Sequence, residues 1–177
     1  MLVTIKRVLN FCLEGLLTVV MTVLVLDVVW QVFTRWVLKN PSSWTEELAT
    51  FLMIWVGMLG ASVALNRGSH LGIDYAVSKL SARTRVMTEV FVFACIGLFS
   101  LFGMFVGGIL FVARTFELGQ TSPALKLPMG YVYLTVPISG FFLVFYSIEL
   151  LVERVRTLRK GVVDEAAQAG QPRFTLD

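Results

Sequence analysis

Four long apolar segments limit what this chain can fold into more than any other feature of its sequence. They cover residues 8–37, 44–65, 86–113 and 128–151. A helix rises about 1.5 Å per residue, so roughly 20 apolar residues cross a hydrocarbon layer about 30 Å thick. With 56% hydrophobic and only 15% charged residues among 177, the sequence predicts an all-α, multi-pass membrane protein with four transmembrane helices.

The segments outside the four spans differ in character. Residues 71–82 carry apolar side chains on one helical face and polar ones on another, which predicts a short amphipathic helix at the membrane interface. Residues 161–177 are polar, contain Gly and Pro and show no sustained period, which is typical of a loosely ordered tail. We therefore expect one four-helix membrane domain over residues 1–160, with a first span too long to be a cleaved signal peptide, followed by a cytoplasmic tail.

Basic residues set the predicted orientation. Of the 15 Lys and Arg residues, only Arg35, Lys39, Arg114 and Lys126 lie at the ends joined by the first and third loops, and the others lie near the termini or in the second loop. Because Lys and Arg accumulate on the cytoplasmic side, both termini should be cytoplasmic. The net charge of +3 then reflects topology and attraction to anionic lipids, and nothing in the spacing indicates nucleic-acid binding.

Several membrane functions require residues that this sequence lacks. Haem held between helices would need two axial imidazoles, and His70 is the single histidine. Cys12 and Cys95 lie apart inside apolar segments, where packing as small hydrophobic residues is the expected role. No G-x-x-x-x-G-K-[ST] phosphate loop occurs. We therefore expect no enzyme activity, no cofactor and no metal site, and the sequence identifies no catalytic residue.

The entry to the second span combines Trp44 with Glu46 and Glu47. Residues 43–46 match a capping box, in which a serine oxygen accepts the N3 amide and a glutamate reaches back to the cap amide. Two carboxylates in the first turn also face the positive end of the helix dipole. Trp44 fits an aromatic anchor at the membrane surface. These local roles account for one glutamate and leave Glu47 without an assigned partner.

Small residues line one face of the second span and one face of the third. They are Gly57, Gly60, Ala61 and Ala64, on the side of Glu46, and Ser100, Gly103 and Gly107, whose stripe Arg114 continues. Small residues let transmembrane helices approach closely. We therefore predict that the second and third spans pack along these faces and that Glu46 pairs with Arg114 at the outer rim. The bulky face of the second span would then be free for lipid or for a partner protein.

Two acids lie within the first span. Glu14 is about two turns from Lys6 and Arg7, so a local ion pair or a position near the interface is the expected explanation. Asp27 is deeper and has no basic residue within a turn. An intramembrane carboxylate indicates a functional site by default, and an ion site, a protonated acid and a contact to another subunit all stay open.

A longer pattern connects these features. A Trp and a Glu pair open the second span, a Trp and small residues follow, and a basic-Gly-x-His-x-x-x-Asp sequence ends it. The residues are Trp44, Glu46, Glu47, Trp55, Gly57, Gly60, Ala61, Arg67, Gly68, His70 and Asp74. Together with residues 122–140, which include Leu125, Pro128, Tyr133 and Pro137, this pattern resembles the small membrane subunit of tripartite ATP-independent periplasmic (TRAP) transporters. The resemblance covers about residues 4–160 and departs at Met129-Gly130, where the family pattern has an aromatic residue that Tyr131 would replace.

The resemblance implies a function that composition and spacing do not reveal. In this family a large multi-helix membrane subunit carries the solute and sodium, and a soluble periplasmic protein captures the solute, commonly an organic acid. The small subunit is a stationary scaffold beside a moving element and helps to form the docking surface for the solute-binding protein. His70 would tie the interfacial helix to the second span through Asp74. The implied location is the bacterial inner membrane, and the implied partners are the large TRAP membrane subunit, the periplasmic solute-binding protein and membrane lipids.

Two other functions stay open from the residues themselves. A small ion-coupled exporter would use Glu14 or Asp27 as a protonatable site and would move a solute alone. A lipid-interacting structural protein would have no transport role. Pro137 is the one proline inside a span and the two halves show no alignable repeat, which argues against a midplane substrate site of the usual transporter kind.

Overall fold

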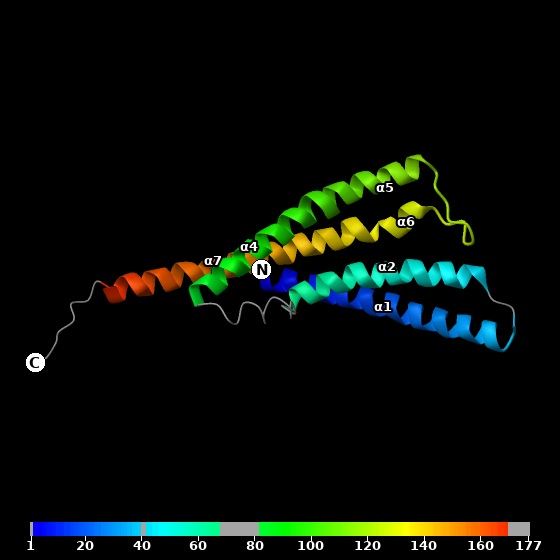
Figure 1. Cartoon of the computed structure of the whole chain (residues 1–177), viewed down its shortest axis with the longest axis horizontal. Helices are drawn as coiled ribbons and strands as arrows, with labels where there is room; N and C mark the ends of the chain where they lie inside the picture. Colours follow the sequence, from blue (N-terminus) through cyan, green and yellow to red (C-terminus); the bar gives the residue numbers. More distant parts are fainter. Residues whose placement is uncertain (1, 40–41, 68–81, 170–177) are drawn as a thin grey trace, which may run out of the picture.

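The fold is built from four helical rods of membrane length. The computed structural model describes residues 2–39, 42–67 and 82–169 (Figure 1). The rods are α1 (Leu2–Trp36); α2 (Ser43–Asn66); α4 (Ala82–Leu98), η1 (Phe99–Val106) and α5 (Gly107–Glu117) in series; and α6 (Met129–Tyr133) with α7 (Thr135–Ala169). In this described part, the helices long and apolar enough to cross a membrane are Lys6–Trp36, Ser43–Asn66, Met87–Glu117 and Met129–Arg156. They confirm the predicted all-α fold with four transmembrane helices.

Two predicted segments outside the spans have different outcomes. The interfacial helix lies outside the described residues up to residue 81, and so do His70 and Asp74. At the other end, α7 continues as a helix to Ala169, past residue 161, where the sequence predicts a loosely ordered tail. Residues 161–169 include Glu, Gln and Ala, which are good helix formers. Extending an existing helix adds a hydrogen bond per residue without the cost of a new nucleus, so the long helix continues through polar sequence.

A widened helical turn interrupts the third rod. In η1 the backbone follows a π-helix, and the amide of Gly107 donates to the carbonyl of Phe102 with the i→i+5 spacing of that helix. A Cβ atom on Gly107 would lie 3.2 Å from this carbonyl oxygen, which is tighter than an ordinary contact. Gly107 therefore suits the widened turn because it has no side chain, a different role from the helix–helix contact that the sequence predicts.

Pro137 explains the break in the fourth rod between α6 and α7. Proline has no amide hydrogen, and its ring clashes with the carbonyl four residues earlier. Here that carbonyl belongs to Tyr133, the last residue of α6. The rod still continues in one direction, since the amide of Leu134 donates to the carbonyl of Gly130. Pro128 precedes α6 as its N-cap residue, so both prolines of the sequence pattern shape the entry to the fourth rod.

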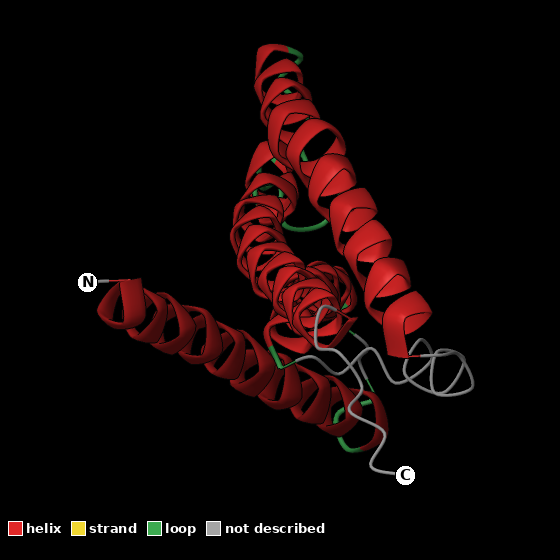
Figure 2. Cartoon of the chain, turned by 90° about the vertical axis from the view of Figure 1, so that its left-hand side faces the viewer, coloured by secondary structure: helices red, strands yellow, loops and turns green. Residues whose placement is uncertain are grey.

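The packing is centred on α7. This helix contacts α2 on one side and the third rod on the other, while α1 packs against α2. The buried core consists of Leu13, Leu59, Val63, Leu65, Leu143 and Tyr146. Within the most apolar window of each span, only 6% to 33% of the residues are buried inside the chain. Figure 2 shows splayed helices in place of a closed bundle, so most of the apolar surface is left for lipid or another membrane protein.

Candidate functional site at the helix ends

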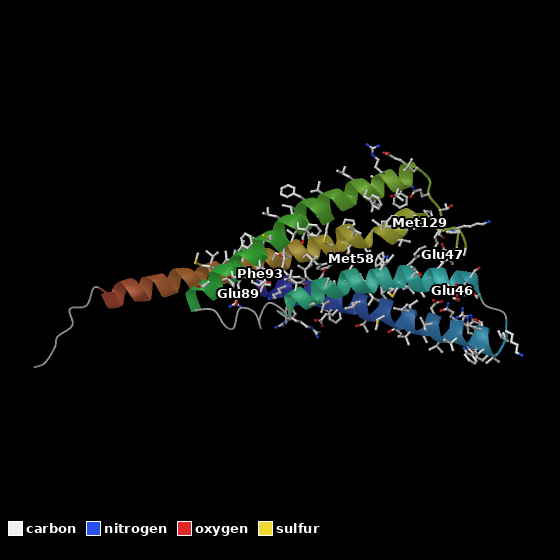
Figure 3. All side chains as sticks on the ribbon, in the orientation of Figure 1. Glu46, Glu47, Met58, Glu89, Phe93 and Met129 are labelled. Carbon is white, nitrogen blue, oxygen red and sulfur yellow. The ribbon has the colours of Figure 1, made fainter. Side chains whose placement is uncertain are left out.

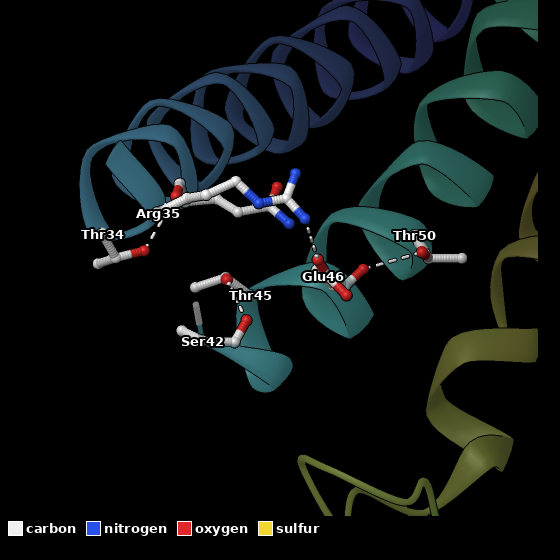
Figure 4. A network of polar contacts seen from close by, with 7 residues as sticks. Thr34, Arg35, Ser42, Thr45, Glu46 and Thr50 are labelled. Carbon is white, nitrogen blue, oxygen red and sulfur yellow. Dashed lines mark hydrogen bonds and ion pairs between the residues drawn. The ribbon is translucent and has the colours of Figure 1, made fainter. Parts of the chain in front are cut away.

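Glu46 pairs with α1 and not with the third rod. Its Oε1 atom lies 3.4 Å from a guanidinium nitrogen of Arg35, and both side chains are more than half exposed (Figure 4). The predicted pair with Arg114 is therefore wrong. A short loop joins α1 to α2 and brings Arg35 beside the start of α2, whereas α7 lies between α2 and the rod that carries Arg114. Arg114 is exposed on α5.

The start of α2 uses a different cap from the predicted one. Ser42, and not Ser43, is the N-cap residue, with extended backbone angles (φ −92°, ψ 115°) and no side-chain cap hydrogen bond. The Thr45 hydroxyl donates to the carbonyl oxygen of Ser42 at 2.8 Å (Figure 4). Because the helix begins at Ser43, Glu46 lies beyond the N3 position that a capping box requires, and its carboxylate turns to Arg35 instead.

Glu47, which the sequence pattern leaves without a partner, holds the loop between α5 and α6. Its Oε2 atom accepts hydrogen bonds from the backbone amides of Ala124 at 2.8 Å and Leu125 at 2.7 Å. Figure 3 shows Glu46 and Glu47 at the same end of α2. One carboxylate thus satisfies two consecutive loop amides through charge-assisted hydrogen bonds. Short-range patterns do not reveal this contact, because 77 positions separate Glu47 from Ala124.

The small-residue contact predicted between the second and third spans does not form. A Cβ atom on Gly57 or Gly60 would meet nothing within 4 Å outside its own stretch of helix. Ala61 on α2 and Gly103 on η1 are exposed. The prediction fails because α7 lies between the two rods and takes up the contact with each of them.

Close approach between helices occurs along α7. A Cβ atom on Gly140 would lie 2.9 Å from the Cβ atom of Met104 in η1, and one on Gly108 would lie 3.1 Å from the ring of Pro137. Where α7 faces α2, the Ser62 hydroxyl of α2 donates to the carbonyl oxygen of Ser139 at 3.2 Å. Small residues therefore mediate helix contacts here, with α7 as the partner in each. Gly140 and Ser139 are small residues within the fourth span, and they are the signal in the sequence that could have indicated this contact.

Ion pairs connect α1 with α2 and α7 at the opposite end from Glu47. Glu14 Oε1 lies 3.1 Å from a guanidinium nitrogen of Arg67, the C-cap residue of α2. Lys6 Nζ lies 2.7 Å from Glu149 Oε1 on α7. Of the two explanations expected for Glu14, the local pair with Lys6 or Arg7 is therefore wrong, and a position near the interface stays a prediction. Because α1 and α2 run in opposite directions, the end of α2 lies beside the beginning of α1, and Arg67 reaches Glu14 there.

Two further polar contacts strengthen the same end. The Tyr146 hydroxyl donates to the side-chain oxygen of Asn10 at 2.6 Å and joins α7 to α1. Arg154 Nε lies 2.9 Å from Glu89 Oε2 and joins α7 to α4. The side chain of Glu89 is 9% exposed, so this pair places a carboxylate in a buried position with a cation beside it. Together these contacts tie α7 to the first and third rods.

Asp27 belongs to a buried stripe of α1. Buried side chains recur every seven residues along this helix, at Leu13, Val20, Asp27 and Thr34, a spacing that keeps one side of a helix against a partner. Asp27 is 7% exposed, and its Oδ2 atom has no hydrogen-bond partner among the described residues. The carboxyl therefore lies inside the chain and not on a surface open to another subunit. The sequence alone does not single out this stripe, because Leu16, Val23 and Trp30 have the same spacing and are exposed.

The aromatic residues of the sequence pattern take up structural positions. Trp55 packs against the core, and Trp44 is 44% exposed at the start of α2. Tyr131 packs edge-on against Phe116 with 5.2 Å between ring centroids, so an aromatic residue does stand at the entry to the fourth rod. The Phe116 ring occupies the space that a side chain at Gly130 would need, which explains the glycine there. In the described part of the chain, no group of three or more His, Cys, Asp or Glu side chains is arranged to hold a metal ion.

The sequence is similar to small permease subunits of one transporter family. The family model described as "Tripartite ATP-independent periplasmic transporters, DctQ component" matches residues 24–157. The sialic acid TRAP transporter small permease protein SiaQ of Vibrio cholerae is 28% identical over 172 residues, with 94% of each chain covered. The C4-dicarboxylate TRAP transporter small permease protein DctQ of Rhodobacter capsulatus is 31% identical over 116 residues, covering 64% of this chain and 50% of that one.

A longer relative contains a similar segment. The sialic acid TRAP transporter permease protein SiaT of Haemophilus influenzae is 41% identical over 78 residues, which are 42% of this chain and 13% of SiaT. The match therefore occupies a small part of a much larger permease chain.

Proposed function

Because the chain belongs to the DctQ component family of the tripartite ATP-independent periplasmic (TRAP) transporters, we propose that it is the stationary scaffold of a sodium-coupled transporter for organic acids. In the proposed complex a large membrane subunit carries the solute and sodium, and a periplasmic solute-binding protein delivers the solute. The scaffold holds the large subunit at a fixed height in the bilayer and contributes to the surface on which the delivering protein docks. The chain itself performs no catalysis in this proposal.

The observation that carries the proposal is the openness of the four spans. At most 33% of the residues in the most apolar window of any span are buried inside the chain. The ion pairs described above join the helices near their ends, and long apolar sides remain available to a second membrane protein. A scaffold needs such sides, whereas a self-contained transporter would enclose a site between its own helices.

The relatives support both the partner and the solute class. In SiaT a segment similar to this chain is part of a permease chain of which it matches only 13%, which supports operation beside a large permease subunit here. The solutes named for the SiaQ and DctQ relatives described above are sialic acid and C4-dicarboxylates. Both are organic acids, and this supports an organic acid as the solute of the proposed complex.

The proposed orientation gives each end of the molecule a role. With both termini in the cytoplasm, the α1–α2 loop and residues 118–128 face the periplasm, and we call residues 118–128 the outer loop. The ion pairs of Glu14, Lys6 and Glu89 then lie near the cytoplasmic surface. The scaffold is thus joined by ion pairs at its inner end, while its outer end, where Glu46 pairs with Arg35 and Glu47 holds the outer loop, faces the solute-binding protein.

Affinity purification from the native membrane in mild detergent tests the proposal. A stoichiometric, larger multi-pass partner should co-purify and be identified by intact mass. The reconstituted pair should take up an organic acid only when a sodium gradient and the solute-binding protein are both supplied. A homodimer that transports a solute alone in liposomes would contradict the scaffold function and favour an ion-coupled exporter.

A further inference from the structure

Two irregular turns in the third and fourth rods lie in contact with each other. The π-helix of η1 passes into α5 at Gly107, and Pro137 stands beside the break between α6 and α7. A Cβ atom on Gly108 would lie 3.1 Å from the ring of Pro137. A regular α-helix resists bending because each carbonyl accepts the amide four residues later, and the π-helix and the proline each interrupt this pattern. Both rods are therefore weakened at the same level.

The segments on the outer side of this level form one unit. The ring of Phe111 in α5 packs edge-on against Tyr133 in α6 with 4.9 Å between centroids, and Phe116 packs in the same way against Tyr131 at 5.2 Å. The outer loop joins the two helices and has backbone hydrogen bonds of its own. The packing of α5 against α6 is also more extensive than that of either helix against α2 or α7. We call α5, the outer loop and α6 the outer arm.

The segments on the inner side are held by contacts with several helices. In α4, Glu89 pairs with Arg154 of α7, and a Cβ atom on Gly97 would be in van der Waals contact with the Ser147 Cβ atom of α7 at 3.4 Å. The ion pair and the hydrogen bond described above also join α7 to α1. Movement of the inner segments would break contacts with more than one helix, so the inner half of the chain is the fixed part.

Glu47 is the polar contact between the outer arm and the first two helices. Among the described residues, the hydrogen bonds from the amides of Ala124 and Leu125 to Glu47 Oε2 are the ones that join the arm to α1 or α2, and no ion pair joins them. The arm lies at the end where the rods splay (Figure 1). One carboxylate therefore holds a unit that has few other contacts with α2.

We propose that η1 and Pro137 form a hinge about which the outer arm swings relative to the rest of the chain, with Glu47 as the latch that holds it. Hinges concentrate a backbone change in a few residues, and Gly107 and Gly108 accept such a change because they have no Cβ atom. Movement of the arm changes the spacing between the outer ends of α5 and α2. It therefore gives the proposed scaffold a moving part, and it does not depend on which partners the scaffold has.

Distances between spin labels test the hinge. The full chain is purified from its native membrane with any bound partner retained and is placed in lipid nanodiscs, after its two native cysteines have been replaced by alanine. One label pair, Val32→Cys with Arg114→Cys, measures the outer ends of α1 and α5. The other, Val8→Cys with Met87→Cys, measures the inner ends of α1 and α4. All four positions are exposed, and double electron–electron resonance gives the distance distribution of each pair.

We expect the outer distance distribution to be about twice as wide as the inner one, because hinge motions are large on the microsecond-to-millisecond scale and freezing traps their range. Glu47→Ala should widen the outer distribution further, whereas Glu46→Ala, one position away, should not. Pro137→Ala restores a donor for the Tyr133 carbonyl and should narrow the outer distribution towards the inner width. Pro128→Ala is the matched control, since this proline precedes α6 and lies outside the hinge.

Three outcomes would overturn the hinge. The first is an outer distribution as narrow as the inner one both in wild type and in Glu47→Ala. The second is an inner distribution that widens as much as the outer one in Glu47→Ala, which would indicate general loosening. The third is a folded Pro137→Ala chain whose outer distribution is as wide as that of Pro128→Ala. The comparison of Glu47→Ala with Glu46→Ala decides the matter even where Pro137→Ala does not fold, and none of these measurements depends on transport.

Discussion

The Oε2 atom of Glu47 lies 2.7 Å from the amide nitrogen of Leu125, although 78 positions separate the two residues in the sequence. This contact joins the start of α2 to the tip of the outer loop. It therefore connects the pair formed by α1 and α2 with the pair formed by the third and fourth rods at the end where the helices splay (Figure 1).

Replacing Glu47 with Ala should release the outer loop. The amides of Ala124 and Leu125 lose their acceptor, and hydrogen bonds to a charged group contribute about 1.5–3 kcal/mol each in favourable sites. We expect hydrogen exchange at these two amides to become at least about tenfold faster, which corresponds to roughly 1.4 kcal/mol. Glu46→Ala is the control one position away, and it should leave both amides protected. Equal exchange rates in the two variants would contradict the role of Glu47.

Gly140 should not tolerate a side chain, whereas Gly57 should. A Cβ atom on Gly140 would lie 2.9 Å from the Met104 Cβ atom and from the Phe105 amide nitrogen, so α7 would have to move away from η1. Overpacking of this kind costs about 1–3 kcal/mol. Thermal unfolding in detergent should show Gly140→Ala melting roughly 3–8 °C below wild type. Gly57→Ala should melt no lower than wild type, because nothing lies within 4 Å of the added atom and Ala favours helix.

Equal melting temperatures for the two glycine variants would mean that α7 does not approach the third rod as closely as described. A Gly140→Ser variant distinguishes the effect of side-chain volume from that of polarity. Because the serine side chain is larger than that of alanine, this variant should melt at or below the melting temperature of Gly140→Ala.

Reversing the charges of Glu14 and Arg67 should show that they form a pair. Their side chains are 45% and 62% exposed, so the pair contributes only about 0.2–1 kcal/mol. Each single reversal should lower the melting temperature slightly at low ionic strength, and the double variant Glu14→Arg/Arg67→Glu should recover most of the loss. The recovery should shrink in 1 M salt, where charges are screened within about 3 Å. A double variant no more stable than the single ones would indicate that the two side chains act independently.

The sequence predicts the helices of this chain better than the contacts between them. Spans depend on local composition, and the four apolar segments correspond to four helical rods. Helical periodicity shows which side chains share a face but not which helix that face meets. The sequence therefore predicts a pair of Glu46 with Arg114, although Arg35 is the partner of Glu46. The order in which the helices pack depends on close approaches such as that at Gly140. Such an approach can be recognised only when the positions of both backbones are known.

Substitution of Asp27 distinguishes the scaffold function from ion-coupled transport by this chain alone. Its side chain is 7% exposed, and Oδ2 has no hydrogen-bond partner among the described residues. A buried polar group without a partner is unfavourable, so Asp27→Leu should leave the assembled complex at least as stable as wild type. Uptake by the reconstituted complex should stay within about twofold of wild type in Asp27→Leu and in Asp27→Asn, which keeps the shape and removes the charge. Loss of uptake in both variants, with unchanged assembly, would show that the carboxyl takes part in ion movement and that the chain is more than a scaffold.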